Sequence, residues 1–220
     1  MKSIEDVIKK CGYPVVSKKV SRMLRDIKNP TDKNEKTRIL YLTGIKSDGS
    51  KSNHFKLPKK YHYLIDSQFN ISEKCCDELK KKPFKKYEKE TGRKPIIGTL
   101  ANESTMRQAS YLKHGCNNFD KGASTPLGFW TEQDILEYIV KNDLRIASVY
   151  GEIKQDQEGK YYLTGEQRTG CVACLLGVEF ERKHTKNRIQ RLKDIEPKKY
   201  YYVLNKLGFK QVLDYMGYKY

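Results

Sequence analysis

Long apolar runs are missing from this 220-residue chain. No stretch approaches the roughly 20 apolar residues that span a bilayer, so we expect no membrane partner. The first residues, MKSIEDVIKKCGYP, place acids and lysines where a secretion signal needs an apolar stretch, and we expect no such signal. Together these features predict a cytoplasmic protein, whose six cysteines are ligands or free thiols rather than disulfides.

Acidic residues are also scarce, with 27 Asp and Glu against 44 Lys and Arg, which leaves a formal net charge of +17. A field of this sign attracts polyanions, and it allows nucleic acid as a partner. The alternative is a solvated, lysine-rich surface, which the dispersion of the lysines along the chain favours. With 16 Tyr and 7 Phe, the chain still has the material for a folded core.

Internal repeats and long low-complexity segments are absent too, so we expect one domain over residues 1–220. Residues 30–60 are interpreted as a polar loop or small excursion, and residues 185–220 as a C-terminal helical segment. Apolar runs predict strands at 95–100 and 146–150. Capping residues and apolar periodicity predict helices at 3–10, 17–28, 104–112, from Thr131 onward, 185–195 and 197–216. This alternation is typical of an α/β domain with a largely parallel sheet.

Two cysteine pairs carry the clearest chemical signal: Cys75-Cys76, and Cys171 with Cys174 in a Cys-x-x-Cys turn. Four thiolates suit a zinc ion or an iron–sulfur cluster. Adjacent cysteines are unusual around zinc, whereas a cluster offers a different iron atom to each, so the pattern favours a four-iron–four-sulfur cluster. The alternatives are a redox Cys-x-x-Cys and an unrelated buried pair. Cys11 and Cys116 are interpreted as structural or incidental.

Several segments resemble the phosphoadenosine-phosphosulfate (PAPS) reductase family. They are Gly12-Tyr13-Pro14 with Ser17-Lys18, Glu103-Ser104 with Arg107, Trp130 to Ile135, and Arg168 to Cys171, and they look like relatives found in mobile elements and DNA-modification gene sets. The Cys-Cys pair, Lys80, Pro83 and the distant Cys-x-x-Cys are similar to the cluster-bearing branch, the adenylyl-sulfate reductases. This resemblance implies an adenine-nucleotide alpha-hydrolase-like parallel sheet with helices on both faces, a 4Fe-4S cluster, Lys80 in the cofactor environment, and sulfur metabolism.

Three departures qualify that resemblance. The family's Ser-Gly-Gly-x-Asp-Ser nucleotide loop is not found, which predicts an N-terminally truncated sheet and a partner chain that supplies the loop. No cysteine follows Cys174, so the family's tail nucleophile has no counterpart. Leu100 stands where the adenylyl-sulfate reductases have a sulfate-binding Arg. We therefore expect the isolated chain to be inactive as a reductase.

The remaining candidates form an anion site for sulfate or an adenine nucleotide. Arg107 and Arg168, with Glu103 and Ser104, are predicted to share a cavity with Lys80 beside the cluster. The alternative for Arg107 is an ion pair with Glu103 at helical spacing. Two functions follow: a subunit that acts in sulfur transfer or in reduction of an adenylated substrate, or a non-catalytic mobile-element derivative that binds nucleic acid or a protein through its basic surface. In the second, Tyr200–Tyr202, Tyr218 and Tyr220 either stack on bases or pack the C-terminal helices.

Overall fold

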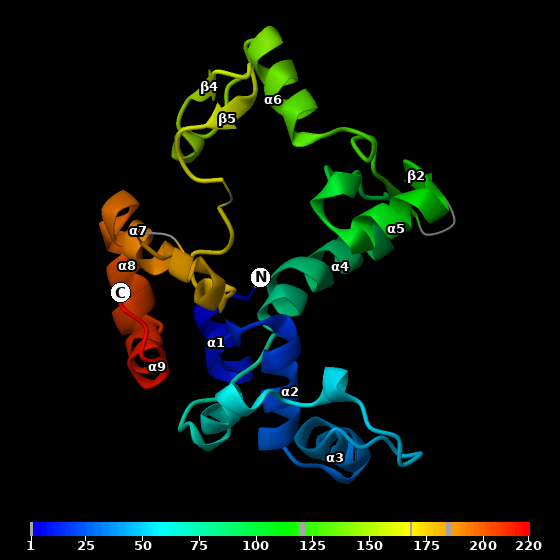
Figure 1. The fold of residues 1–220 in the computed structure, drawn as a ribbon, viewed down its shortest axis with the longest axis vertical. Helices are drawn as coiled ribbons and strands as arrows, with labels where there is room; N and C mark the ends of the chain where they lie inside the picture. The colour runs from blue at the N-terminus through cyan, green and yellow to red at the C-terminus, as the bar shows by residue number, and fades with distance from the viewer. Residues whose placement is uncertain (1, 119–121, 168, 184–185) are drawn as a thin grey trace. The chain divides into compact units, whose positions relative to one another are not determined.

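The computed structural model of the chain describes residues 2–118, 122–167, 169–183 and 186–220. The chain divides into two compact units (Figure 1). One comprises Met1–Pro83 and Gly170–Tyr220, and the other comprises Phe84–Thr169. Among the described residues, no helix combines the length and the apolar content needed to span a membrane.

The first unit is mainly helical, with short 3-10 or π-helical segments labelled η. Its elements are α1 (Ile4–Cys11), β1 (Val15–Val16), α2 (Lys18–Lys28), η1 (Asp32–Asn34), α3 (Glu35–Thr43), η2 (Asn53–Phe55), η3 (Lys59–Asp66), η4 (Asp77–Lys81), β6 (Leu175–Leu176), η7 (Val178–Lys183), α7 (Arg188–Ile195), α8 (Pro197–Tyr201), η8 (Tyr202–Lys206) and α9 (Phe209–Met216). α4 (Lys82–Thr91) continues from η4 across the boundary between the units.

The two N-terminal helices form as their local sequence predicts. Ser3 caps α1 and makes a reciprocal capping box with Asp6. Ser17 caps α2 by accepting a hydrogen bond from the Val20 N–H. The predicted apolar face of α2 is buried, with Leu24 fully enclosed, so amphipathic spacing suffices to define this helix and its inward side.

A short parallel sheet organises the first unit. Val15 and Val16 of β1 pair with Leu175 and Leu176 of β6. On the other side of the same segment, Tyr13 forms a parallel bridge with Ile71. Three parts of the chain that are distant in sequence therefore run side by side in one direction, with the residues around Pro14 in the middle.

Gly12 permits this arrangement. Its φ of 97° lies in the region that favours glycine, and a Cβ at this position would stand 2.4 Å from the Asn70 carbonyl carbon and oxygen. The Tyr13 N–H then donates to the Asn70 carbonyl over 2.8 Å. A side chain at position 12 would push the two segments apart and break the bridge at Ile71.

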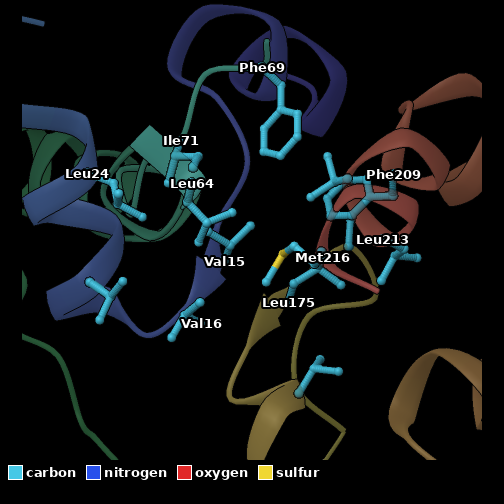
Figure 2. Packing of buried hydrophobic residues seen from close by; sticks show 14 of the residues in the cluster. Val15, Val16, Leu24, Leu64, Phe69, Ile71, Leu175, Phe209, Leu213 and Met216 are labelled. Carbon is cyan, nitrogen blue, oxygen red and sulfur yellow. The ribbon is translucent and has the colours of Figure 1, made fainter. Parts of the chain in front are cut away.

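The core of the unit surrounds this sheet. Figure 2 shows buried side chains that converge from β1, β6, α2 and the C-terminal helix α9. Phe209 is fully buried and meets the Tyr13 ring edge-on, with 5.0 Å between ring centroids. The Tyr13 hydroxyl donates to the Leu207 carbonyl. The C-terminal segment is therefore part of the core rather than an appendage to it.

The C-terminal helical segment differs in one respect from its prediction. Residues 197–216 do not form one helix, because Gly208 adopts a left-handed conformation with φ of 72° and separates η8 from α9. A Cβ at Gly208 would approach the Tyr13 hydroxyl oxygen to 2.7 Å. The break lets α9 turn back onto the core.

The second unit has less regular structure. Its elements are η5 (Ala101–Glu103), α5 (Thr105–His114), β2 (Asn117–Asn118), β3 (Ala123–Ser124), α6 (Glu132–Lys141), η6 (Ser148–Tyr150), β4 (Ile153–Gln155) and β5 (Tyr161–Leu163). The predicted helices at 104–112 and from Thr131 are confirmed, capped by Ser104 and Thr131. β2 with β3 and β4 with β5 are antiparallel pairs.

Three sequence interpretations are corrected by the structure. Residues 95–100 form no strand beyond a single parallel bridge from Ile96 to Ser124, and residues 148–150 form a 3-10 turn. Within the predicted polar loop at 30–60, Glu35–Thr43 are helical. Ile96 remains 78% exposed, so the apolar run that predicted a buried strand has no sheet covering it among the described residues. The fold is thus mixed α/β with one small parallel sheet.

Candidate functional site: the cysteine cluster

The two predicted cysteine pairs lie on the two segments that flank the residues around Pro14 in the small parallel sheet. Since Ile71 lies opposite Tyr13 and Leu175 opposite Val15, the segments that lead to the two pairs flank Pro14 on either side. The Ser72 N–H donates to the Tyr13 carbonyl over 2.9 Å, and the Leu175 N–H donates to the Pro14 carbonyl over 3.2 Å. Cys75-Cys76 follow the first contact closely, and Cys174 immediately precedes the second. The sheet therefore holds the two cysteine-bearing segments on either side of Pro14, and the charges of Cys76 and Cys174 both act on Cys75.

The four thiols interact with one another electrostatically. Burial, reinforced by the charges of Cys76 and Cys174, raises the pKa of Cys75 to about 12. Burial also raises the pKa of Cys174, with a further upward contribution from Cys171 and Cys76. The Leu176 N–H and the Arg188 charge oppose this rise. Without a compensating cation, such thiols remain protonated at neutral pH.

Lys80 lies beside the same group of four cysteines. It sits in η4, a π-helical turn that begins directly after Cys76. The pKa of Lys80 is raised first by the charge of Cys171 and by a hydrogen bond to that thiol, with smaller contributions from Cys76 and Cys174. A π-turn changes the angular spacing of side chains along a helix, and such turns are frequent at functional sites. This one directs an ammonium group toward three of the four cysteines.

Among the residues that the structure describes, no three His, Cys, Asp or Glu side chains are grouped closely enough to hold a single metal ion. Cys75 is buried, Cys76 and Cys174 are half-buried, and Cys171 is exposed.

Arg188 is a residue of the site that the sequence analysis missed. A Cβ added at Gly170 would lie 3.8 Å from the Arg188 guanidinium, and one added at Gly177 would lie 3.6 Å from it. The guanidinium therefore lies along the loop that carries Cys171 and Cys174. Its Nε donates to Glu181 over 2.6 Å, and its charge acts on Cys174. One signal was available: a cation in the first turn of a helix opposes the helix dipole, which indicates a task elsewhere.

A buried ion pair anchors the loop that leads to Cys75. The Glu73 carboxylate is 7% exposed and accepts from the Arg25 guanidinium over 2.5 Å. Arg22 approaches the same oxygen at 3.4 Å, while the other Glu73 oxygen has no hydrogen-bond partner. Both arginines project from α2, so the pair ties the cysteine loop to a helix whose apolar face is buried.

We expect Glu73→Gln to lower the free energy of unfolding of the first unit by about 2 kcal/mol, because the Arg25 charge then loses its buried partner. This loss of stability is smaller than that expected for a fully buried ion pair, since Arg25 is 21% exposed and retains its ion pair with Asp26, at 2.9 Å. Urea denaturation followed by circular dichroism measures it. Asp194→Asn, which removes an exposed pair with Lys186, is the matched control and should change stability little. Equal effects of the two substitutions would contradict the anchoring role.

The structure describes some, but not all, of the residues that were predicted to bind an anion. Arg107 pairs with Glu103, as the structural alternative for this residue predicted. Ser104 accepts from the Arg107 N–H as the N-cap of α5. Arg168 lies outside the described residues. Lys80 belongs to the first unit and Arg107 to the second, so the shared cavity stays a prediction.

Arg107 nevertheless lines a cavity within the second unit. The cavity has a volume of about 270 Å³, and its polar walls include Ser110, Tyr111, His114 and Thr125. The pKa of Tyr111 is raised by burial and by the charge of Cys116, to which it is hydrogen bonded. The cavity combines a guanidinium, an imidazole and hydroxyls, which are groups suited to an anionic oxygen ligand.

The tyrosines considered for base stacking belong mostly to the core. Tyr200 is 4% exposed, and Tyr218 and Tyr220 pack against the hydrophobic core of the first unit. The Tyr220 hydroxyl donates to Asp214 over 2.8 Å. Tyr201, at 59% exposed, and Tyr202, at 41%, remain accessible. The packing interpretation is therefore confirmed for three of the five rings.

The fold and the site together define a mixed α/β protein with four neighbouring cysteines on segments of a small parallel sheet. The sequence profile of the phosphoadenosine phosphosulfate reductase domain matches residues 16–176, and the chain belongs to this family. Comparisons with curated proteins and with solved structures found no significant match.

Proposed function

We propose that this chain binds one 4Fe-4S cluster through Cys75, Cys76, Cys171 and Cys174. The observation that carries the proposal is that two cysteine pairs from distant parts of the chain lie close enough to act on one another electrostatically, on segments that flank Pro14 on either side. A buried thiol such as Cys75 would be inert without a partner, and four neighbouring thiols beside two cations are better explained as ligands.

The donor set fits a cluster. Its ligands are all soft sulfurs, which select iron–sulfur centres, zinc or copper(I). Cys75 and Cys76 are neighbours in the chain and can each bind a different iron atom. Zinc bound by the same four thiolates is the alternative.

The cations of the site have a defined part in this proposal. Once bound, the cluster would supply a negatively charged, polarisable centre. Lys80 faces Cys171, Cys76 and Cys174, and Arg188 faces Cys174, so both hold positive charge against the thiolates. Glu181 fixes the Arg188 guanidinium in place. The two cations lower the cost of deprotonating four neighbouring thiols.

We infer that the chain acts in the cytoplasm as a subunit for sulfur transfer or for reduction of an adenylated substrate. Membership of the PAPS reductase family supports this class of reaction. The cavity beside Arg107 is proposed to hold a sulfate or phosphate oxygen of the substrate, with Glu103 and Ser104 fixing the start of α5. Because residues 1–220 contain no Ser-Gly-Gly-x-Asp-Ser loop, the nucleotide-binding half is proposed to come from a partner chain.

The surface around α5 supports a partner. Met106 and Leu112 of α5 are 85% and 76% exposed, and Ile96 of the same unit is 78% exposed. Among the described residues of that unit, Leu136 is the one buried hydrophobic side chain. A unit that buries so little of its apolar surface by itself favours contact with another protein.

The cofactor is tested by anaerobic purification. We expect brown protein with about four iron and four acid-labile sulfide ions per chain. Zinc at one ion per chain, without iron or sulfide, would replace the cluster with the alternative centre.

The isolated chain is expected to release no sulfite from adenylyl sulfate or PAPS with thioredoxin as the electron donor. The phosphate loop is missing, and no cysteine follows Cys174 to attack the substrate sulfur. Sulfite release is measured against a no-enzyme control on cluster-loaded protein. A rate above that control would show that the 220 residues suffice.

A non-catalytic function is the alternative. The net charge of +17 would let a mobile-element derivative bind nucleic acid or an acidic protein, with the cluster as a structural element. Equilibrium binding separates the two functions. An adenine nucleotide should bind the enzyme subunit, alone or with its partner, whereas salt-sensitive DNA or RNA binding without any nucleotide dependence would favour the derivative.

A further inference from the structure

The open face of α6 forms an aromatic pocket that no part of the proposed function uses. Phe129 and Trp130 precede the helix, and Tyr138 lies on it. Asp134, Glu137 and Lys141 share this face at helical spacing and complete the walls of a cavity of about 430 Å³. All six residues fall within one short segment, so the pocket belongs to the second unit alone.

The three rings are inclined to one another rather than stacked. Trp130 and Tyr138 meet at 73° with centroids 5.4 Å apart, and Phe129 and Trp130 meet at 56° with centroids 6.4 Å apart. Rings inclined in this way form walls and leave ring faces uncovered. Phe129 is 64% exposed and Tyr138 is 49% exposed, so the rings do not bury one another.

The helix that carries the pocket is held from its other side. Leu136 is buried, and Gln133 exchanges two hydrogen bonds of 2.8 Å with the backbone of Tyr161 in β5. Figure 1 shows α6 beside the β4–β5 hairpin. Thr131 and Asp134 form a reciprocal capping box at the start of the helix. The pocket face is therefore supported by a fixed scaffold.

The charges of the pocket decide which ligand it suits. Asp134 and Glu137 bring two carboxylates, against the single ammonium of Lys141, which pairs with Glu137 over 2.5 Å. This is a net negative site on a chain with a charge of +17, and it disfavours nucleotides and other anions. Ring faces attract cations, and a methylated ammonium, which lacks strong hydrogen-bond donors, prefers them to water more than a lysine does.

We propose that the pocket of Phe129, Trp130 and Tyr138 binds a quaternary ammonium group, with Glu137 supplying the counter-charge. A trimethylammonium head is compact enough for the cavity and presents its charge to all three rings. The Lys141 ammonium competes with the ligand for the Glu137 carboxylate, because the two side chains form an ion pair while the pocket is empty.

Titration with choline tests the proposal. Trp130 is the one tryptophan of the chain, so its fluorescence reports directly on the pocket. We expect a saturable change in emission with choline, and binding about 5- to 10-fold weaker for 3,3-dimethyl-1-butanol, the uncharged isostere. Equal affinity for the two compounds would show a merely apolar pocket and overturn the proposal. A flat titration with choline to tens of millimolar would overturn it as well.

Variants that retain Trp130 sharpen the test. Tyr138→Leu and Glu137→Gln should each weaken choline binding about 3- to 10-fold, whereas Lys141→Gln should strengthen it by freeing Glu137. Tyr162→Leu removes an exposed ring of the same unit outside the pocket, and it should leave the affinity unchanged. Far-UV circular dichroism checks that each variant is folded. A Tyr138→Leu affinity equal to that of Tyr162→Leu would contradict a role for the ring.

Discussion

Cys171→Ser is expected to remove most of the iron from anaerobically purified protein and to lower its stability. A serine oxygen is a poor replacement for a thiolate on iron, and a centre with three remaining sulfurs loses its fourth anchor. Because metal binding contributes folding free energy, the apparent melting temperature should fall together with the iron content. Iron and sulfide analysis, absorbance and thermal unfolding measure the three effects on one preparation.

Cys116→Ser provides the matched control for this experiment. Cys116 lies in the second unit, where it is hydrogen bonded to Tyr111, and it has no place in the cluster. This variant should keep its full iron content. If Cys171→Ser retains as much iron as Cys116→Ser, the ligand assignment is wrong.

Phe209→Ala is expected to lower the free energy of unfolding of the first unit by about 3–5 kcal/mol. The ring is fully buried and packs edge-on against Tyr13, at the point where the C-terminal helix meets the central strand segment. Its removal leaves a cavity beside the segment that aligns both cysteine pairs. The loss should therefore appear in denaturant unfolding and in a lower iron content under the same conditions.

Phe180→Ala controls for the loss of a phenyl ring. Phe180 belongs to the same unit but is 69% exposed, so little apolar area returns to water when it is removed. The expected change is within about 1 kcal/mol. A large effect here, or a small one at Phe209, would contradict the packing shown in Figure 2.

Helices with local signals could be predicted from the sequence. The caps at Ser3 and Thr131 each satisfy backbone groups within a single turn, and they lie where their motifs indicated. Strands could not be predicted equally well. The run at 95–100 is apolar enough for a buried strand, yet a strand needs partners on either side, and Ile96 has a single bridge. The break at Gly208 depends on the approach of Tyr13 from a distant part of the chain.

By itself, the sequence determined the predicted donor set: four cysteines in two pairs, with a lysine placed one helical turn after the first pair. Only the tertiary structure decided that these thiols and the Lys80 ammonium act on one another, and that Arg188 joins them. The physical reason is that the two pairs are distant in sequence, so their approach depends on long-range pairing of segments beside Pro14, where Tyr13 aligns with Ile71 and Val15 with Leu175. That pairing is stabilised by a core to which both ends of the chain contribute, so no single local segment encodes it.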